Sequence, residues 1–251
     1  MVNSEGDVAA FGEAPFFGTA AGTTLQGIVT AMAATPDDKG YWLAGSNGGV
    51  LAFGDANWYG SASKLHLAKR VVGIAAAPGG RGYWLVASDG GIFAYGDAHF
   101  YGSVSKYHLD EPIVGIASTP DGHGYWIVSR NGGIFAFGDA GFYGSAGDLK
   151  LNKPIVAIIA SGDGRGYYLI AEDGGVFAFG DAGFLGSLPG DHIAANVVAV
   201  SPTYKGRGYY VLTARGKIYA FGSGGRPRDP ARSVYSVPGA AVAIVGSRRP
   251  G

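Results

Sequence analysis

The sequence contains no cysteine, so disulfide bonds and thiolate metal sites are both excluded. It also lacks net charge, because Lys plus Arg and Asp plus Glu each total 19. Binding to nucleic acid rests on a basic excess that releases counterions, so we expect no nucleic-acid partner. No apolar run approaches the ~20 residues that span a bilayer, so we expect no membrane insertion. Sustained helical periodicity with caps is missing too, which predicts an all-β fold.

The sequence is rich in glycine and contains an internal repeat. The chain has 46 glycines in 251 residues, while its 47% apolar content argues against disorder. Gly-Tyr-Trp or Gly-Tyr-Tyr recurs every 42 residues, starting at Gly40, Gly82, Gly124, Gly166 and Gly208. An aromatic-Gly-acid motif keeps the same step. A period of about 40–45 residues is typical of propellers and repeat arrays.

The third copy shows the pattern within one repeat. Pro112–Thr119 and Gly124–Ser129 are short apolar runs separated by a turn. Asn131-Gly132 predicts a hairpin, since this pair readily adopts the positive φ angles of a type I′ turn. Ile134–Phe137 forms a third run, and Phe142-Tyr143 begins a fourth. We therefore predict four short antiparallel strands in each repeat.

Six such units favour a six-bladed β-propeller, whose sheets pack both faces on their neighbours. We expect one domain over residues 1–251, and the following segments are the expected blades: 1–27, 28–69, 70–111, 112–153, 154–195 and 196–240, with 241–251 closing the ring onto the N-terminus. Met1 aligns with Leu43, inside a second strand, while Ala241–Val245 aligns with a first strand. The two ends of the chain are thus predicted to complete one sheet, which removes exposed edges. An open solenoid and a closed prism of three-stranded units are the alternatives.

Two periodic polar series are predicted on one face, because antiparallel strands place the first turn and the segment after the third strand at the same end. The cationic series is Lys39, Arg81, His123, Arg165 and Arg207. The acidic series is Asp55, Asp97, Asp139 and Asp181, with Glu13 and Ser223 as divergent copies. Both series predict a ring of binding sites in which Arg grips a carboxylate or hydroxyl-rich ligand. Alternatively, each Asp accepts backbone N–H bonds within its own turn and pairs with the nearby cation.

Aromatic pairs recur as well, at Phe16-Phe17, Trp58-Tyr59, Phe100-Tyr101, Phe142-Tyr143 and Phe184-Leu185. Such rings can serve as stacking platforms, which makes Trp58 a binding candidate, or they can pack between blades. On the opposite face, the positions His66, His108, Lys150 and His192 share one register, with Thr24 in the first copy. Residues one blade apart are too distant for Zn–N bonds of ~2.0–2.1 Å, so we expect neither a metal nor a cofactor. Ser61-Ala-Ser-Lys64 matches S-x-x-K but lies in a return loop, and we assign no catalytic residues.

The repeat consensus resembles one common in actinobacterial proteins, where it is often joined to secreted peptidoglycan hydrolases, peptidases or esterases. The most specific stretches are Gly96-Asp97-Ala98 and Phe100–Ser103, and the match is weakest at Gly222–Gly225. The strand layout also looks like that of NHL-type and tectonin-like propellers. This resemblance implies an extracellular or cell-surface module for binding or scaffolding, and it carries over no catalytic residues.

We therefore expect a monomeric, non-enzymatic propeller that recognises a glycan, a cell-wall polymer or a protein partner. Two alternatives are a purely structural scaffold and a propeller hydrolase of lactonase- or glycosidase-like type. The segment Met1–Asp7 lacks the basic and apolar regions of a signal peptide, so an export signal is expected to lie outside these 251 residues.

Overall fold

The computed structural model describes residues 1–251 except 12–13, 24–26, 204–206, 223–240 and 246–251. The expected copies at Glu13 and Ser223, Thr24 in the histidine register and the final loop 224–239 lie outside the described residues. The regular secondary structure of the described residues is β except for one 3-10 turn at Pro189–Asp191, which confirms the all-β prediction. Within those ranges, no helix has the length and hydropathy needed to cross a bilayer.

Strands recur in threes along the described chain. The first strand of each set is β2 (Val29–Ala34), β5 (Val71–Ala76), β8 (Ile113–Ser118), β11 (Ile155–Ala160) or β14 (Val197–Pro202). The second is β3 (Gly40–Gly45), β6 (Gly82–Ala87), β9 (Gly124–Ser129), β12 (Gly166–Ala171) or β15 (Gly208–Thr213). The third is β4 (Val50–Gly54), β7 (Ile92–Gly96), β10 (Ile134–Gly138), β13 (Val176–Gly180) or β16 (Ile218–Gly222). Each set forms one antiparallel three-stranded sheet with its second strand in the middle.

The two ends of the chain meet in a further sheet. β1 (Val2–Asn3) pairs antiparallel with β17 (Ala241–Ala243), and Val2 lies opposite Ala243. Val2 is also bridged to Val8, and the Ser4 carbonyl accepts the N–H of Val29 at the start of β2. This pairing confirms that the N-terminal and C-terminal segments share one sheet.

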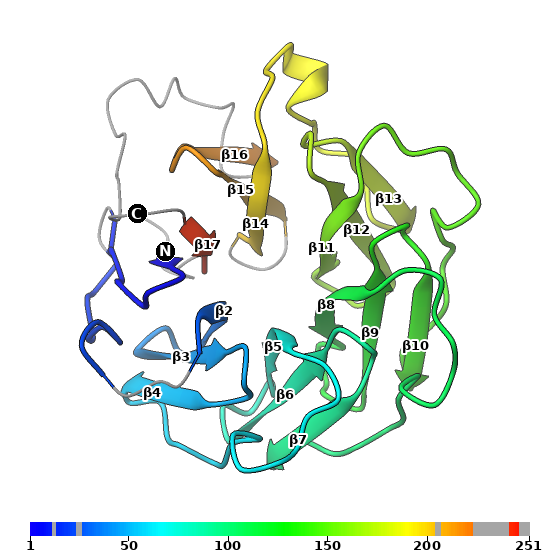
Figure 1. The fold of residues 1–251 in the computed structure, drawn as a ribbon. Helices are drawn as coiled ribbons and strands as arrows, with labels where there is room; N and C mark the ends of the chain where they lie inside the picture. The colour runs from blue at the N-terminus through cyan, green and yellow to red at the C-terminus, as the bar shows by residue number, and fades with distance from the viewer. Residues whose placement is uncertain (12–13, 24–26, 204–206, 223–240, 246–251) are drawn as a thin grey trace.

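The sheets follow one another around a ring (Figure 1). The first strands are in contact in the order β2, β5, β8, β11, β14 and β17, and β17 contacts β2 again. Glycine permits close approach at these contacts: a Cβ on Gly73 of β5 would lie 3.3 Å from Ile116 of β8.

The core lies between the sheets. The middle strands are buried along most of their length, because both of their faces meet a neighbouring sheet. Trp84 of β6, for example, packs against Tyr125 of β9 with ring centroids 5.8 Å apart. This stacking of sheet on sheet explains why the second strands read as unbroken apolar runs.

Two local predictions differ from the structure. The predicted fourth strand is absent from the described residues around Phe142-Tyr143, which run as irregular chain. Gly144 has φ +131°, which ends strand geometry there. In the hairpin, Asn131 does not have a positive φ. Only Gly132 has a left-handed φ, of +88°, and its N–H donates to the Ser129 carbonyl. The hairpin is therefore a turn followed by a left-handed glycine and not a type I′ turn.

Candidate functional site

One face of the ring carries both periodic polar series. Because Gly40 pairs with Gly54, the turn before β3 lies beside the segment that follows β4. The N–H of Asp55 accordingly donates to the Lys39 carbonyl at 3.1 Å, and the N–H of Asp97 donates to the Arg81 carbonyl at 2.7 Å. We call this the turn face. In the four sheets from β2–β4 to β11–β13 it consists of residues 35–39, 55–58, 77–81, 97–100, 119–123, 139–142, 161–165 and 181–184.

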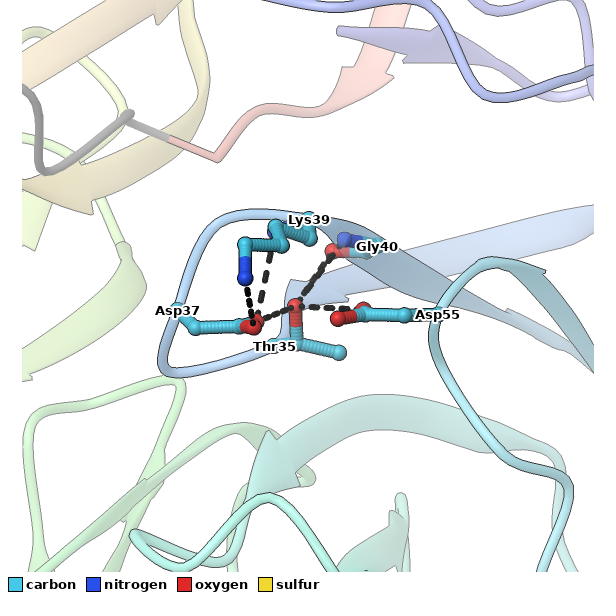
Figure 2. A network of polar contacts seen from close by, with 5 residues as sticks. All are labelled: Thr35, Asp37, Lys39, Gly40 and Asp55. Atoms are coloured by element: carbon cyan, nitrogen blue, oxygen red, sulfur yellow. Dashed lines mark hydrogen bonds and ion pairs between the residues drawn. The ribbon is translucent and has the colours of Figure 1, made fainter.

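A hydroxyl group organises the polar side chains of the turn before β3 (Figure 2). The Thr35 hydroxyl lies 2.8 Å from Asp37 Oδ1 and 3.4 Å from Asp55 Oδ1. It also accepts the N–H of Gly40 at 3.0 Å. Lys39 Nζ lies 3.6 Å from Asp37 Oδ2, so the cation pairs with the turn aspartate and not with Asp55. Two carboxylates thus lie on either side of one buried hydroxyl.

The same arrangement of two carboxylates recurs in two other sheets, as Asp121 with Asp139 and Asp163 with Asp181. The Thr119 hydroxyl, followed by the His123 backbone N–H, lowers the pKa of Asp121 well below its usual range. Partial desolvation, followed by the adjacent Asp121 carboxyl group, raises the pKa of Asp139. The pKa values of each pair are therefore pushed apart, with the turn aspartate held as the anion.

The remaining turns show what the hydroxyl and the second carboxylate contribute. Ala77 and Gly79 replace the hydroxyl and the turn aspartate in the β5–β6 turn, and Arg81 there pairs with Asp97 at 3.3 Å. In the β14–β15 turn, the equivalent Thr203 is buried and its Oγ1 has no partner among the described residues. Arg207 is exposed there. A cation and an acid of the two series thus form an ion pair as predicted at Arg81 and Asp97, whereas Lys39 and His123 pair with the turn aspartates Asp37 and Asp121.

Asp121, His123 and Asp139 form the one group in the described chain whose ligand atoms could hold a metal ion. Their ligand atoms lie within 4.8 Å of one another, and all three residues are exposed. Two carboxylates and an imidazole suit a divalent cation chemically. His123 Nδ1 already lies 3.4 Å from Asp121 Oδ2, and Asp121 accepts the Thr119 hydroxyl at 2.7 Å. The turn's own hydrogen bonds therefore account for this grouping. In the β11–β12 turn, the Arg165 backbone N–H donates to Asp163 at 3.2 Å, and the Arg165 charge acts on Asp181.

The second ring of each aromatic pair packs between sheets. The Tyr101 N–H donates to Tyr125 Oη of the next sheet at 3.1 Å, and Tyr101 Oη donates to the Gly122 carbonyl at 3.2 Å. Tyr125 Oη in turn donates to the Gly102 carbonyl at 2.7 Å. The same bonds recur at Tyr59 with Tyr83 and at Tyr143 with Tyr167. Packing between sheets, the alternative explanation, is thus correct for this half of each pair.

The first ring of each pair is exposed. Phe16, Trp58, Phe100, Phe142 and Phe184 expose between 57% and 63% of their surface. We call these five residues the aromatic series. They occupy one position of the repeat, two residues after the Ala of Gly-Asp-Ala or, for Phe16, of Gly-Glu-Ala, and Trp58, Phe100, Phe142 and Phe184 lie on the turn face. Packing within the protein does not account for large aromatic side chains at these exposed positions, so Trp58 and its equivalents remain candidates for binding.

Sequence reasoning missed the turn aspartates Asp37, Asp121 and Asp163 as site residues. They fall on the same 42-residue period as the acidic series, with Gly79 at the position between Asp37 and Asp121, and this period could have identified them. It also missed the hydroxyl residues Thr35, Thr119 and Ser161, which lie two positions earlier.

Comparison with known proteins identifies the fold only. No family model and no curated protein matches this chain. Among solved structures, the chain is similar to the β-propeller domain of Cps50 (Swd1) from Myceliophteria thermophila, with a TM-score of 0.54 and 12% identity over 80% of this chain and 70% of that one. It is also similar to U3-55K, with a TM-score of 0.52 and 13% identity over 80% of this chain and 63% of that one. These likenesses, together with the ring of repeated sheets, show that the chain adopts a β-propeller fold.

Proposed function

We propose that this chain is a non-enzymatic binding module, a six-bladed β-propeller that holds a protein partner on its turn face. The blade count is supported by the six first strands that contact one another in a ring and by six copies of a 42-residue repeat. We propose the whole of residues 1–251 as one domain, with β1 and β17 belonging to the sixth blade.

The aromatic series carries this proposal. Burial removes large apolar side chains from water, so five exposed rings at one repeat position have no role in the core. Tyr101 and its equivalents already supply the contact between sheets. Aromatic side chains are enriched among the residues that anchor protein interfaces. The turn face presents one such ring per repeat beside polar turns.

A glycan or cell-wall polymer is the second candidate partner. One observation favours it: each ring of the aromatic series is exposed in its own repeat, 42 residues from the next. A polymer with a repeating unit could contact several rings at once, and weak sites of this kind gain avidity of about 10²–10⁴ through multivalency. The resemblance of the repeat to that of secreted actinobacterial proteins supports an extracellular or cell-surface location, which we include in the proposal.

The test compares two sets of alanine substitutions in the intact chain. The first replaces Trp58, Phe100 and Phe142, and the second replaces the exposed Leu65, Tyr107 and Leu149 of the return loops, which are 52–71% exposed. Each protein is immobilised, and retained proteins are identified by mass spectrometry, with a glycan array run in parallel.

We expect the parent chain and the return-loop variant to retain the same partner and the aromatic variant to lose it. If all three proteins retain the partner equally, or if neither assay detects binding, the proposal is refuted and a purely structural scaffold is favoured. Binding on the glycan array alone, lost in the aromatic variant, would select the second candidate.

A further inference from the structure

The neutral chain separates its charges between the two faces. The turn face of the four sheets from β2–β4 to β11–β13 carries eight aspartates and three Lys or Arg residues, so its formal net charge is minus five. The acids are Asp37, Asp38, Asp55, Asp97, Asp121, Asp139, Asp163 and Asp181, and the bases are Lys39, Arg81 and Arg165. On the opposite face, the hairpins and return loops 46–49, 61–70, 88–91, 103–112, 130–133, 145–154, 172–175 and 187–196 carry seven acids and seven bases. The net charge of the whole chain therefore conceals an acidic face.

Local ion pairs do not neutralise this face. Lys39 with Asp37 and Arg81 with Asp97 are pairs at 3.6 and 3.3 Å, and their side chains are 49–77% exposed. Exposed pairs of this kind are weak and screened by salt, so the carboxylates remain accessible to other cations. Each double-aspartate turn also holds at least one more carboxylate than Lys or Arg, as at Asp163, Asp181 and Arg165. A cation supplied from outside would relieve the repulsion between the two carboxylates.

Exposed rings lie on the same face as this negative charge. Asp139 and Phe142 are both exposed and lie three residues apart, and Asp97 with Phe100 repeats that spacing. An aromatic face attracts ammonium and guanidinium groups, and a carboxylate beside it adds charge-assisted hydrogen bonds. Lysine and arginine also have apolar stems that can lie along a ring. Anionic polymers, by contrast, would be repelled by the balance of minus five over these four sheets.

We propose, on the basis of the proposed function above, that the turn face binds a polypeptide segment rich in lysine and arginine. The segment would lie across neighbouring repeats, with its cationic side chains between the paired aspartates and the rings of the aromatic series. Because the contacts repeat from sheet to sheet, binding depends on several turns at once, and electrostatic attraction sets its salt dependence.

Peptide binding can be followed by the fluorescence of Trp58. The chain has four tryptophans, and Trp42, Trp84 and Trp126 are at most 1% exposed whereas Trp58 is 61% exposed. The fluorescence of the intact protein is followed during titration with an oligoarginine peptide. An oligoglutamine peptide of equal length and a neutral chito-oligosaccharide serve as comparisons.

Two charge variants test the face. Asp139→Asn with Asp181→Asn removes two charges from the turn face, and Asp148→Asn with Asp173→Asn removes two from the opposite face as a matched control. We expect the first pair to weaken oligoarginine binding about tenfold and the control pair to change it less than about twofold. We also expect binding to weaken with added salt and oligoglutamine to cause no change.

Equal weakening by the two charge variants, or no binding of oligoarginine, would overturn this inference. If oligoarginine fails while a protein partner is still lost with the aromatic variant, the inference is wrong and the proposed function stands. If the chito-oligosaccharide alone binds and shifts Trp58 fluorescence, the partner is a glycan and this inference is wrong. If the aromatic variant changes no binding of any kind, the proposed function itself fails.

Discussion

The hydroxyl group of Tyr125 joins two neighbouring sheets, and its removal tests how the ring is held together. Its ring is fully buried and packs against Trp84, Tyr101 and Phe137 with centroids 5.5–5.9 Å apart. Its hydroxyl accepts the Tyr101 N–H at 3.1 Å and donates to the Gly102 carbonyl at 2.7 Å. Tyr125→Phe keeps the ring and removes only these two bonds.

The expected cost follows from those two bonds. A typical hydrogen bond contributes about 1 kcal/mol net, and a partner left unsatisfied in a buried site costs about 1–3 kcal/mol. We expect Tyr125→Phe to lower the free energy of unfolding by about 2–3 kcal/mol. For a domain of this size, each kcal/mol lowers the melting temperature by about 2–4 °C, so the shift is about 4–12 °C.

Tyr107→Phe is the matched control, because Tyr107 is 71% exposed and the change is chemically identical. Its effect should stay within about 0.5 kcal/mol. Thermal and urea unfolding of both variants and the parent chain provide the comparison. Equal melting temperatures for the two variants would show that the hydroxyl does not link the sheets, and the packing argument would be wrong.

Two further predictions concern glycine and pH. Gly102→Ala should strongly lower the free energy of unfolding, because Gly102 has φ +140° and an added Cβ would lie 2.6 Å from the Phe137 ring. Gly79→Ala is the control, because an added Cβ there would have no atom within 4 Å, and it should change the free energy of unfolding by less than about 1 kcal/mol. Similar melting temperatures for both variants would contradict this. Burial raises the pKa of Tyr83 from 10.0 to about 12, so its contribution to stability is complete below pH 10 and is lost as the pH rises towards 12. Ultraviolet titration of Tyr83→Phe against the parent should remove one late-titrating phenol, and an unchanged titration curve would argue against burial of that hydroxyl.

The 42-residue repeat predicts the sheets well because each motif in it has a fixed structural role. Gly124-Tyr125-Trp126 begins a second strand whose tyrosine bonds to the preceding sheet, and Trp126 Nε1 donates to the Gly141 carbonyl at 2.7 Å. Where Tyr168 replaces the tryptophan, its Oη donates to the Gly183 carbonyl at 3.0 Å, so these contacts favour an aromatic donor and the repeat is visible in the sequence. The pairing of the two chain ends follows from the same alignment and is confirmed by Val2 opposite Ala243.

The fourth strand could not be predicted correctly from local sequence. Phe100-Tyr101 has strand-forming residues, yet the Tyr101 N–H bonds to a side-chain hydroxyl of the next sheet and Gly102 turns the chain. Sequence alone could not separate the buried ring from the exposed one in each aromatic pair, because both belong to the same residue class. The negative charge of the turn face was also missed, because the turn aspartates Asp37, Asp121 and Asp163 were not counted with the acidic series.

Cross-linking the two ends of the chain tests the closed ring most directly. The chain has no cysteine, so Val2→Cys with Ala243→Cys introduces one possible disulfide, between residues that lie opposite each other. Directly paired residues in antiparallel strands are about 4.5–5.5 Å apart at Cα, within the range of disulfides. Val2→Cys with Ser105→Cys, which places the second thiol in the return loop between β7 and β8, is the control. We predict that mild oxidation closes the first pair and raises the melting temperature, while the control stays reduced; a first pair that also stays reduced would contradict the ring.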